Sequence, residues 1–419
     1  MKPEDLKMKH ENEEIRVLIL GEYFPPKQNT AASRLHSFFH FLPEYGITPI
    51  VFCRKETINT ESPIIPSGHS EVHYVPVTPD FYERNIPLLK NRLLKNILIA
   101  VSLVFENSRF KQKHHQYKTA ITKYLLKYPV HLILASGTPF MMFSVASEIS
   151  QEFGIPWIAD YRDDWSSNRV FNTNRLALWL RWLDSRREKK FTKNALCFTT
   201  VSNVLRQRIE ASIGKRGYLV ENGFWEYPST PRIVSGKSLR ILYAGSIYHS
   251  QDLTFLHQTI QLLKARHIQQ VEFVFLGSQP EFLTPLDQTY VKIIPRVTRD
   301  EAWEYILNAD ILLYISFKSG HEVLKGIPAS KLYDYIYSCK PILVQESDGD
   351  IVEEKLSQSG QGLFCETPEK MFEYILNFKN QKETQGFITP IDVPATFLAQ
   401  NSRKHQAYLL SEVIKKHLQ

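Results

Sequence analysis

LRILYAG at residues 239–245 and VEFVFLG at residues 271–277 are the two stretches that decide the fold. Each is a short run of apolar, β-branched and aromatic residues that predicts a buried strand, and each ends in glycine. A glycine at the carboxyl end of a parallel strand lets the backbone turn sharply, and ligands of open α/β sheets bind at that edge. The two stretches therefore predict a parallel sheet with a ligand site at its carboxyl edge.

Short strand-like runs alternate with longer helical stretches along nearly the whole chain, which is the pattern of βαβ units in an α/β fold. Helical spacing of apolar residues predicts helices at residues 31–45 and 139–153. The predicted strands are residues 15–20, 47–53, 130–136, 157–161 and 196–201 in the first half, and 239–245, 271–277, 291–295, 311–316 and 341–345 in the second.

The length of 419 residues is about twice that of one compact domain, so two cores are expected. The polar, proline-containing stretch EYPSTPRIVSGKS separates the two series of strands and suits a linker. The predicted organisation is a loose tail at 1–14, a first domain at 15–225, a linker at 226–238, a second domain at 239–395 and a C-terminal helix at 396–419.

The composition is that of an ordinary globular protein, with 43% hydrophobic and 23% charged residues. A net charge of +7 favours anionic partners, which include nucleic acid, an anionic membrane face and phosphorylated substrates. Nucleic acid is disfavoured because the basic residues accompany neither zinc-finger spacing nor an RNA-recognition signature. The first 14 residues lack the apolar core of a signal peptide, so a cytoplasmic location is expected.

The sequence favours neither a metal nor a redox cofactor. Cys53, Cys197, Cys339 and Cys365 lie far apart without a C-x-x-C pair, which predicts reduced thiols and no metal site. The loop at residues 21–33, GEYFPPKQNTAAS, contains one glycine instead of G-x-G-x-x-G, which argues against a nicotinamide or flavin cofactor.

Residues 88–105 place apolar side chains three or four positions apart and predict an amphipathic helix too short to span a membrane. Such a helix suits an anionic lipid surface, although packing on the first sheet with a solvated basic face explains the pattern too. Between residues 90 and 118 the only acid is Glu106, against the basic residues Lys90, Arg92, Lys95, Arg109, Lys111, Lys113 and Lys118.

Two charged clusters follow predicted strands. In IPWIADYRDDW the strand at 157–161 delivers Asp160, Arg162 and Asp163 to its carboxyl end. One interpretation is an ion-pair network that braces the strand, another is contact with a substrate, and paired carboxylates also suit glycoside hydrolysis.

The second cluster lies in GIPASKLYDYIYSCKPIL at residues 326–343. Ser330 opens a predicted helix, Lys331 adds a cation, and Asp334 lies one turn later. A diphosphate would be stabilised by the helix start and the lysine, and the aspartate would accept hydrogen bonds from a ribose. An ordinary exposed helix face is the alternative.

These motifs resemble those of glycosyltransferase family 4. Residues 326–343 resemble its P-S-K-L-F-E-Y-x-x-x-x-K-P-I-L signature, the loop at 21–33 resembles its Y-F-P-P-like turn before a helix with an early arginine, and residues 160–165 resemble D-Y-R-D-x-W. The resemblance extends over nearly the whole chain from Ile15. It implies the GT-B fold, in which two Rossmann-like domains with parallel sheets face a central cleft and a C-terminal helix crosses back to the first domain.

The resemblance implies transfer of a sugar from a nucleotide-diphosphate-sugar donor to a glycan or lipid-linked acceptor, in cell-surface polysaccharide biosynthesis at the inner membrane face. It implies retention of anomeric configuration without a metal or cofactor. The catalytic residues it implies are Arg162, Asp163 and Lys331. The implied donor-binding residues are Gly245, Ser246, Arg296, Val297, Ser330, Lys331 and Asp334, and the implied acceptor-binding residues are Asn29, Thr30, Arg34 and Asp160.

The chain departs from the family pattern at one position. The family has two glutamates eight positions apart, and Asp334 takes the place of the second while Gly326 takes the place of the first. Glu322 or Lys325 are candidate substitutes for the missing glutamate. Two alternatives therefore stay open: a nucleotide-sugar epimerase of the same fold, and a non-catalytic protein that binds nucleotide or membrane in polysaccharide assembly.

Overall fold

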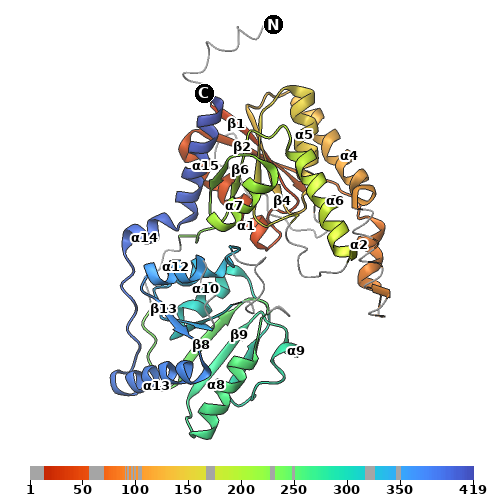
Figure 1. Ribbon diagram of the computed structural model, residues 1–419. Helices are drawn as coiled ribbons and strands as arrows, with labels where there is room; N and C mark the ends of the chain where they lie inside the picture. Colours follow the sequence, from red (N-terminus) through yellow and green to blue (C-terminus); the bar gives the residue numbers. More distant parts are fainter. Residues whose placement is uncertain are drawn as a thin grey trace. The chain divides into compact units, whose positions relative to one another are not determined.

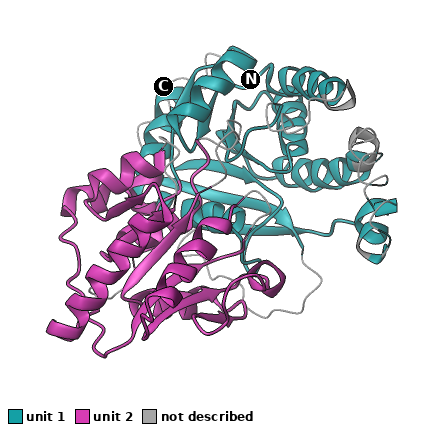
Figure 2. Cartoon of the chain, turned by 60° about the horizontal axis from the view of Figure 1, so that its bottom comes forward, with its two compact units in different colours: residues 1–221, 407–419 teal, residues 222–406 magenta. Residues whose placement is uncertain are grey.

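The computed structural model describes residues 14–55, 70–89, 91, 94–95, 98, 101, 106–166, 175–226, 232–247, 251–316, 326–345 and 351–419. The chain divides into two compact units (Figure 2). Unit 1 comprises Met1–Glu221 and Ala407–Gln419, and unit 2 comprises Asn222–Gln406. Each unit is built on one parallel sheet.

The sheet of unit 1 has seven parallel strands in the order β3-β2-β1-β4-β5-β6-β7 (Figure 1). The chain winds outward from β1 in one direction and then from β4 in the other. Ligands of such sheets bind at the carboxyl edge near the reversal. The strands are β1 (Ile15–Leu20), β2 (Ile47–Arg54), β3 (Glu71–Val75), β4 (Leu132–Gly137), β5 (Trp157–Tyr161), β6 (Cys197–Thr200) and β7 (Gly217–Leu219).

Three helices of unit 1 begin after a polar side chain, Asn29, Asp80 or Ser202, that accepts a hydrogen bond from a first-turn amide. Ser202, for example, caps α7 by accepting a hydrogen bond from the amide of Leu205. The helical elements are α1 (Thr30–Phe41), η1 (Leu42–Tyr45), α2 (Phe81–Asn85), η2 (Ile86–Leu88), α4 (Glu106–Leu125), α5 (Met141–Phe153), α6 (Arg175–Thr192), α7 (Asn203–Ile213) and, from Ala407 onward, α15 (Arg403–Leu418).

The sheet of unit 2 has six parallel strands in the order β10-β9-β8-β11-β12-β13. The strands are β8 (Leu239–Ala244), β9 (Val271–Leu276), β10 (Val291–Ile294), β11 (Ile311–Ile315), β12 (Ile342–Gln345) and β13 (Gly362–Cys365). The helices are α8 (Thr254–Ala265), α9 (Pro280–Leu283), α10 (Arg299–Leu307), α11 (Lys331–Tyr337), α12 (Ile351–Gln358), α13 (Pro368–Gln385) and α14 (Ala395–Gln400).

Both faces of this second sheet are buried, as a parallel sheet requires. Successive residues of β8 point to opposite faces, so that Ile241 and Tyr243 join one hydrophobic cluster with α8 and α13. Leu242 and Ala244 join the other cluster with α10, α11 and α12. The helices after the strands thus hold the carboxyl edge of the sheet in a fixed arrangement.

The structure confirms the predicted fold class, with two parallel Rossmann-like sheets and a chain end that returns to unit 1. All ten predicted strands are present, and the largest shift at a strand start is that of β4, which begins at Leu132. The strands that were not predicted, β3, β7 and β13, lie at sheet edges and are mostly half-buried. Edge strands lack the continuous apolar run that identifies a central strand.

The predicted surface helix at residues 88–105 lies largely outside the described residues, and α4 begins at Glu106. Of the basic residues assigned to that region, Lys113 is buried and pairs with Glu83, while Lys118 pairs with Glu148. These two cations are therefore engaged within unit 1. Within the described part of the chain, no helix has the length and hydrophobicity needed to cross a bilayer.

Candidate functional site

A cation without a counter-ion marks the carboxyl edge of the sheet in unit 2. The ammonium of Lys331, the first residue of α11, lies 3.4 Å from the ring centroid of Tyr243 on β8 and 5.9 Å from that of Tyr314 on β11. Among the described residues Lys331 has neither a carboxylate partner nor a hydrogen bond. Burial lowers the pKa of Lys331 well below its usual value, because the charged ammonium is less well solvated inside the protein than in water. Such a half-buried cation attracts an anionic ligand.

Gly245 opens the space beside this cation. Its φ of 121° lies in a region that residues with a side chain rarely adopt, and a Cβ there would be 3.7 Å from the Lys331 ammonium. The Gly245 amide donates to the carbonyl of Leu276, however, with a donor–acceptor distance of 2.8 Å. The predicted role of Gly245 in donor binding therefore cannot come from its amide, which is already bonded. The amide of Ser246 forms no hydrogen bond within the described residues and stays a candidate.

The start of α11 is less open than the sequence predicts. The amide of Leu332 donates to the carbonyl of Ala329 at 3.0 Å, and that of Tyr333 donates to the carbonyl of Ser330 at 3.2 Å. Ser330 makes no side-chain cap. Because these first-turn amides are already used, the ammonium of Lys331 is the more available group for an anion than the amides of Leu332 and Tyr333.

Asp334 lies one turn after Lys331 and keeps an unsatisfied oxygen. Its Oδ1 is 3.6 Å from Nη2 of Arg299 and accepts no hydrogen bond in the described structure. Burial raises the pKa of Asp334, against the opposing charges of Arg299 and Arg403. This Oδ1 is buried, so a ligand hydroxyl such as that of a ribose can reach only the accessible part of the carboxylate, whose side chain is 24% exposed.

The other predicted donor residues lie at the same sheet edge. Arg296 and Val297 follow β10, where Arg296 is exposed and Val297 packs on the hydrophobic core. Gly326, at the position of the family's first glutamate, has a φ of 85°, a conformation that a glutamate adopts only with strain. Glu322 and Lys325 lie outside the described residues.

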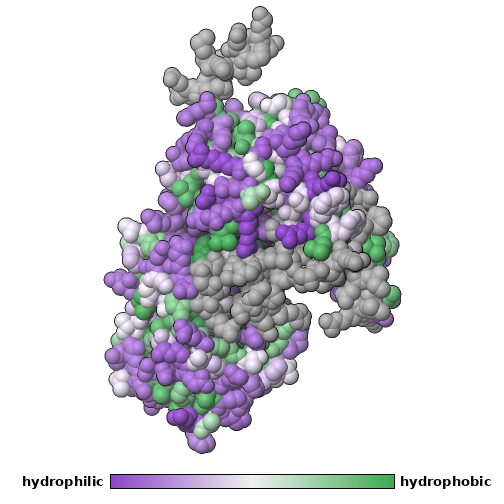
Figure 3. All heavy atoms as spheres, in the orientation of Figure 1, coloured by the Kyte–Doolittle hydropathy of each residue, from purple (hydrophilic) through white to green (hydrophobic). Residues whose placement is uncertain are grey.

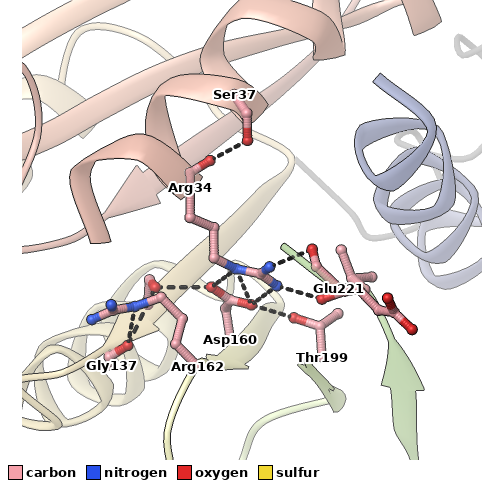
Figure 4. Close-up of polar contacts among 9 residues, drawn as sticks. Arg34, Ser37, Gly137, Asp160, Arg162, Thr199 and Glu221 are labelled. Atoms are coloured by element: carbon pink, nitrogen blue, oxygen red, sulfur yellow. Dashed lines mark hydrogen bonds and ion pairs between the residues drawn. The ribbon is translucent and has the colours of Figure 1, made fainter. Parts of the chain in front are cut away.

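In unit 1, Arg34 and Asp160 form a buried pair with exposed side-chain fractions of 1% and 0% (Figure 4). The guanidinium donates to Asp160 at 2.7 and 3.0 Å and to the carbonyl of Glu221 at 2.8 Å. Asp160 also accepts hydrogen bonds from the hydroxyls of Ser136 and Thr199, both at 2.8 Å. Burial alone would raise the pKa of Asp160, but the guanidinium and hydroxyls hold it below its usual value.

This geometry corrects the prediction that Arg34 and Asp160 contact an acceptor. Neither side chain has exposed surface, and their polar atoms are used to join α1, β5 and the chain segment after β7. The pair is an internal brace for the carboxyl edge of the sheet.

Arg162 and Asp163 follow directly after β5 and are half-buried. Arg162 donates from Nε to the carbonyl of Gly137 at 2.7 Å (Figure 4). Its Nη2 donates to the carbonyl of Thr138 at 3.1 Å. Burial lowers the pKa of Arg162, while Asp163 and Asp160 oppose that effect. The hydroxyl of Thr138 donates to Asp163 at 3.2 Å. Both side chains hold the loop after β4 and remain accessible to a substrate.

The predicted acceptor residues of the first loop are placed at the start of α1. Asn29 caps this helix, because its Oδ1 accepts a hydrogen bond from the amide of Ala32 at 2.7 Å. Thr30 is exposed at the first helical position. The cap accounts for Asn29 without an acceptor, whereas Thr30 stays a candidate contact.

The sequence interpretation missed an arginine pair near Asp334. The guanidinium carbons of Arg299 and Arg403 lie 5.5 and 5.6 Å from the ring centroid of Trp225. Arg299 follows the helix-capping residue Thr298, which signals only a helix start, and Arg403 lies more than a hundred residues further along the chain. No local pattern could have brought them together.

Comparisons with known proteins give the fold its context. No family model matches the chain, and no curated protein sequence matches it. Sucrose-phosphate synthase from Thermosynechococcus elongatus is similar in structure, with a TM-score of 0.62 and 13% identity over 96% of this chain and 98% of that one. HepE from Anabaena, in complex with UDP and glucose, gives 0.58 and 14% over 96% and 100%.

The lipopolysaccharide outer core galactosyltransferase WaaB gives a TM-score of 0.57 and 10% identity over 96% of this chain and 100% of that chain. These structural neighbours are glycosyltransferases of the GT-B type, and this chain has their fold over nearly its whole length. Within the described residues, no three His, Cys, Asp or Glu side chains gather in a way that could hold a metal ion.

Proposed function

We propose that the protein is a glycosyltransferase that binds a nucleotide-diphosphate-sugar at the carboxyl edge of the sheet in unit 2. The observation that carries this proposal is the ammonium of Lys331, which lies beside Gly245 without a carboxylate partner in the described residues. A diphosphate supplies negative charge to this ammonium, which has no carboxylate partner among the described residues. The GT-B fold supports the proposal, and one structural neighbour, HepE, was solved with UDP and glucose.

The chemistry follows from where charge develops. When the bond between the sugar and the phosphate breaks, negative charge grows on the departing nucleoside diphosphate. The ammonium of Lys331 stabilises that charge and thereby lowers the barrier. Asp334 accepts a hydrogen bond from the ribose through the accessible part of its carboxylate, since its side chain is 24% exposed. The donor is thus held at two points one helical turn apart.

The residues of unit 1 take the acceptor side of the reaction. Arg162 and Asp163 contact the acceptor or the transferred sugar, with Thr30 as a further contact. Arg34 and Asp160 position this edge of the sheet without touching a substrate. We assign no protein nucleophile, and we propose that the reaction retains anomeric configuration and needs no metal, in line with the family that the motifs resemble.

The proposed acceptor is a glycan or a lipid-linked sugar of cell-surface polysaccharide biosynthesis, met in the cytoplasm at the membrane face. Two structural neighbours support this class: WaaB is a lipopolysaccharide galactosyltransferase, and WaaG is a glycosyltransferase of lipopolysaccharide biosynthesis.

The test begins with thermal unfolding of the whole protein in a panel of nucleoside diphosphates and nucleotide sugars. A true donor at 100 times its Kd stabilises the fold by about 2.7 kcal/mol. Mass spectrometry of products on lipid-linked acceptors then identifies the sugar transferred. Lys331→Ala should remain folded and lose both stabilisation and turnover. Failure of every nucleotide to stabilise the protein at millimolar concentration contradicts the proposal.

A second candidate function is favoured by Gly326, which leaves no carboxylate at the position of the family's first glutamate. A protein without that group could bind nucleotide sugars as an epimerase, or bind them without any catalysis. Isotope exchange in the absence of acceptor identifies an epimerase. Donor binding without any product identifies the non-catalytic protein.

A further inference from the structure

Helix α6 of unit 1 presents large apolar side chains to solvent. Leu178, Trp179 and Trp182 have exposed fractions of 55%, 45% and 50%. Positions three and four apart on a helix are neighbours, so all three side chains lie on one face. Exposed tryptophans grouped in this way are unusual on a soluble surface and indicate a binding surface.

The charges around this face are all positive. Between residues 178 and 192 the exposed charged residues are Arg181, Arg186, Lys189 and Lys190. The two acids of the same stretch, Asp184 and Glu188, are buried on the inner side of the helix. Asp184 lies 3.5 Å from Arg187, and Glu188 accepts a hydrogen bond from Ser212 at 3.2 Å.

The apolar and basic groups are interleaved. The guanidinium of Arg186 lies 4.1 Å from the ring centroid of Trp182. Where Figure 1 draws α6, Figure 3 shows hydrophobic atoms beside strongly hydrophilic ones. Next to the helix, a cavity of about 240 Å³ is lined by Lys111, Arg187 and Lys190, with Glu148 among the other lining residues. Glu148 is itself paired with Lys118 at 3.2 Å.

We propose that the exposed face of α6 docks unit 1 on an anionic lipid bilayer. Tryptophan favours the interface between water and lipid, where its ring meets acyl chains and its N–H stays hydrated. The arginines and lysines then meet lipid phosphates, and no exposed acid of this stretch repels them. The charge pattern selects an anionic surface over a neutral one. This surface lies on a different helix from residues 88–105 and requires no donor.

The experiment measures co-sedimentation of the whole protein with vesicles, without nucleotide. One set contains phosphatidylcholine alone, and the other contains an equimolar mixture with phosphatidylglycerol. The wild type should bind only the anionic vesicles, and salt should weaken that binding. Trp179→Ala with Trp182→Ala should weaken it about tenfold because apolar area is lost. Arg181→Glu with Arg186→Glu should weaken it by more than about 25-fold, at about fivefold per charge.

Matched controls lie elsewhere in unit 1. Leu126, which is 75% exposed just after α4, can be changed to serine, and the exposed Lys123 and Lys127 can be changed to glutamate. The lysine variant changes the net charge by the same amount as the arginine variant, and the leucine variant removes a smaller apolar area than the tryptophan variant; both controls should bind like the wild type. Circular dichroism checks that every variant is folded.

Three results overturn the proposal: no binding to anionic vesicles, equal binding to neutral vesicles, or equal weakening by the α6 and control variants. Sedimentation velocity without lipid tests a second copy of the chain as the occupant. A dimer that Trp179→Ala with Trp182→Ala dissociates assigns the face to self-association instead. None of these four outcomes affects the assignment of Lys331 to the donor, since the donor is absent from this experiment.

Discussion

Units 1 and 2 each place a basic residue and an aspartate near the carboxyl edge of a parallel sheet, but the two groups differ in what they leave unsatisfied. Arg34 and Asp160 are buried and satisfied by each other and by their neighbours. Lys331 has no carboxylate partner in the described residues, and Asp334 keeps 24% of its side chain exposed. A structural pair fills its bonding capacity, whereas a binding site keeps some for its ligand. The comparison thus separates a brace from a site.

Removing one charge from the brace should give the largest effect. Asp160→Asn keeps the shape of the side chain but leaves the Arg34 guanidinium buried without a counter-charge, at a cost of about 3–5 kcal/mol in the free energy of unfolding. Urea denaturation at neutral pH measures this loss. Asp163→Asn, at a half-buried position three residues later, is the control and should cost less than about 1 kcal/mol. Equal losses in the two variants contradict the brace.

The same pair gives a pH dependence at the acid end. The pKa of Asp160 is lower in the folded protein than in the unfolded chain. Its charge therefore contributes stability above the unfolded pKa of about 3.9, and that stability is lost as the pH falls toward the folded pKa. Urea midpoints of the wild type should fall over this acid range, and those of Asp160→Asn should fall less. Parallel curves for the two proteins contradict the assignment.

At the proposed donor site around Lys331, a rise in pH should weaken ligand binding. Because the pKa of Lys331 lies well below 10.5, the ammonium loses its proton as the pH rises through that lowered value. Loss of a charge-assisted hydrogen bond is worth about 1.5–3 kcal/mol, which corresponds to about tenfold to a hundredfold in nucleoside diphosphate affinity. Lys331→Arg should keep its affinity to higher pH. An identical pH profile for both proteins counts against a role for the lysine charge.

A smaller effect is expected at Asp334. Asp334→Asn removes the charge of the ribose acceptor and should weaken donor binding by up to about tenfold, the size of one ordinary hydrogen bond. Calorimetric titration with the donor measures it. Asp300→Asn, at an exposed position in the first turn of α10, is the control and should leave affinity unchanged. A donor affinity of Asp334→Asn equal to the wild type removes Asp334 from the site.

The smallest predicted effect is a gain in the stability of the folded protein when Lys331 loses its charge. A lowered pKa means that the unfolded chain binds the Lys331 proton more tightly than the folded protein, so the charge costs stability at neutral pH. Lys331→Met should therefore raise the free energy of unfolding, by less than about 1 kcal/mol, as measured by urea denaturation without ligand. Destabilisation by this substitution would show that Lys331 is a structural residue.

The central strands of both sheets and the order of elements follow from the sequence, because buried strands carry continuous apolar runs. The position of Lys331 and Asp334 in unit 2 also follows from a local motif that fixes their spacing along one helix. The edge strand β3 could not be predicted in this way, since its sequence EVHYV has no continuous apolar run and all its side chains except the last are half-buried.

Pairings between residues far apart in the chain could not be predicted from the sequence. An ion-pair network was one interpretation of the cluster at Asp160, but the sequence did not identify its partner Arg34, 126 positions away, which makes the complete burial of Asp160 possible. The sequence also does not show whether a polar group is already hydrogen-bonded. The amide of Gly245, for example, donates to the carbonyl of Leu276. Exposure of Trp179 and Trp182 likewise emerges only once α6 packs on its neighbours.

The most direct test of the account is the affinity of nucleoside diphosphates for Lys331→Met, compared by titration calorimetry with the wild type and with folded Asp160→Asn. The account predicts that Lys331→Met loses about tenfold to a hundredfold in affinity while Asp160→Asn, where it remains folded, binds like the wild type. Wild-type affinity in Lys331→Met would show that the diphosphate binds elsewhere and would contradict the assignment of this sheet edge to the donor.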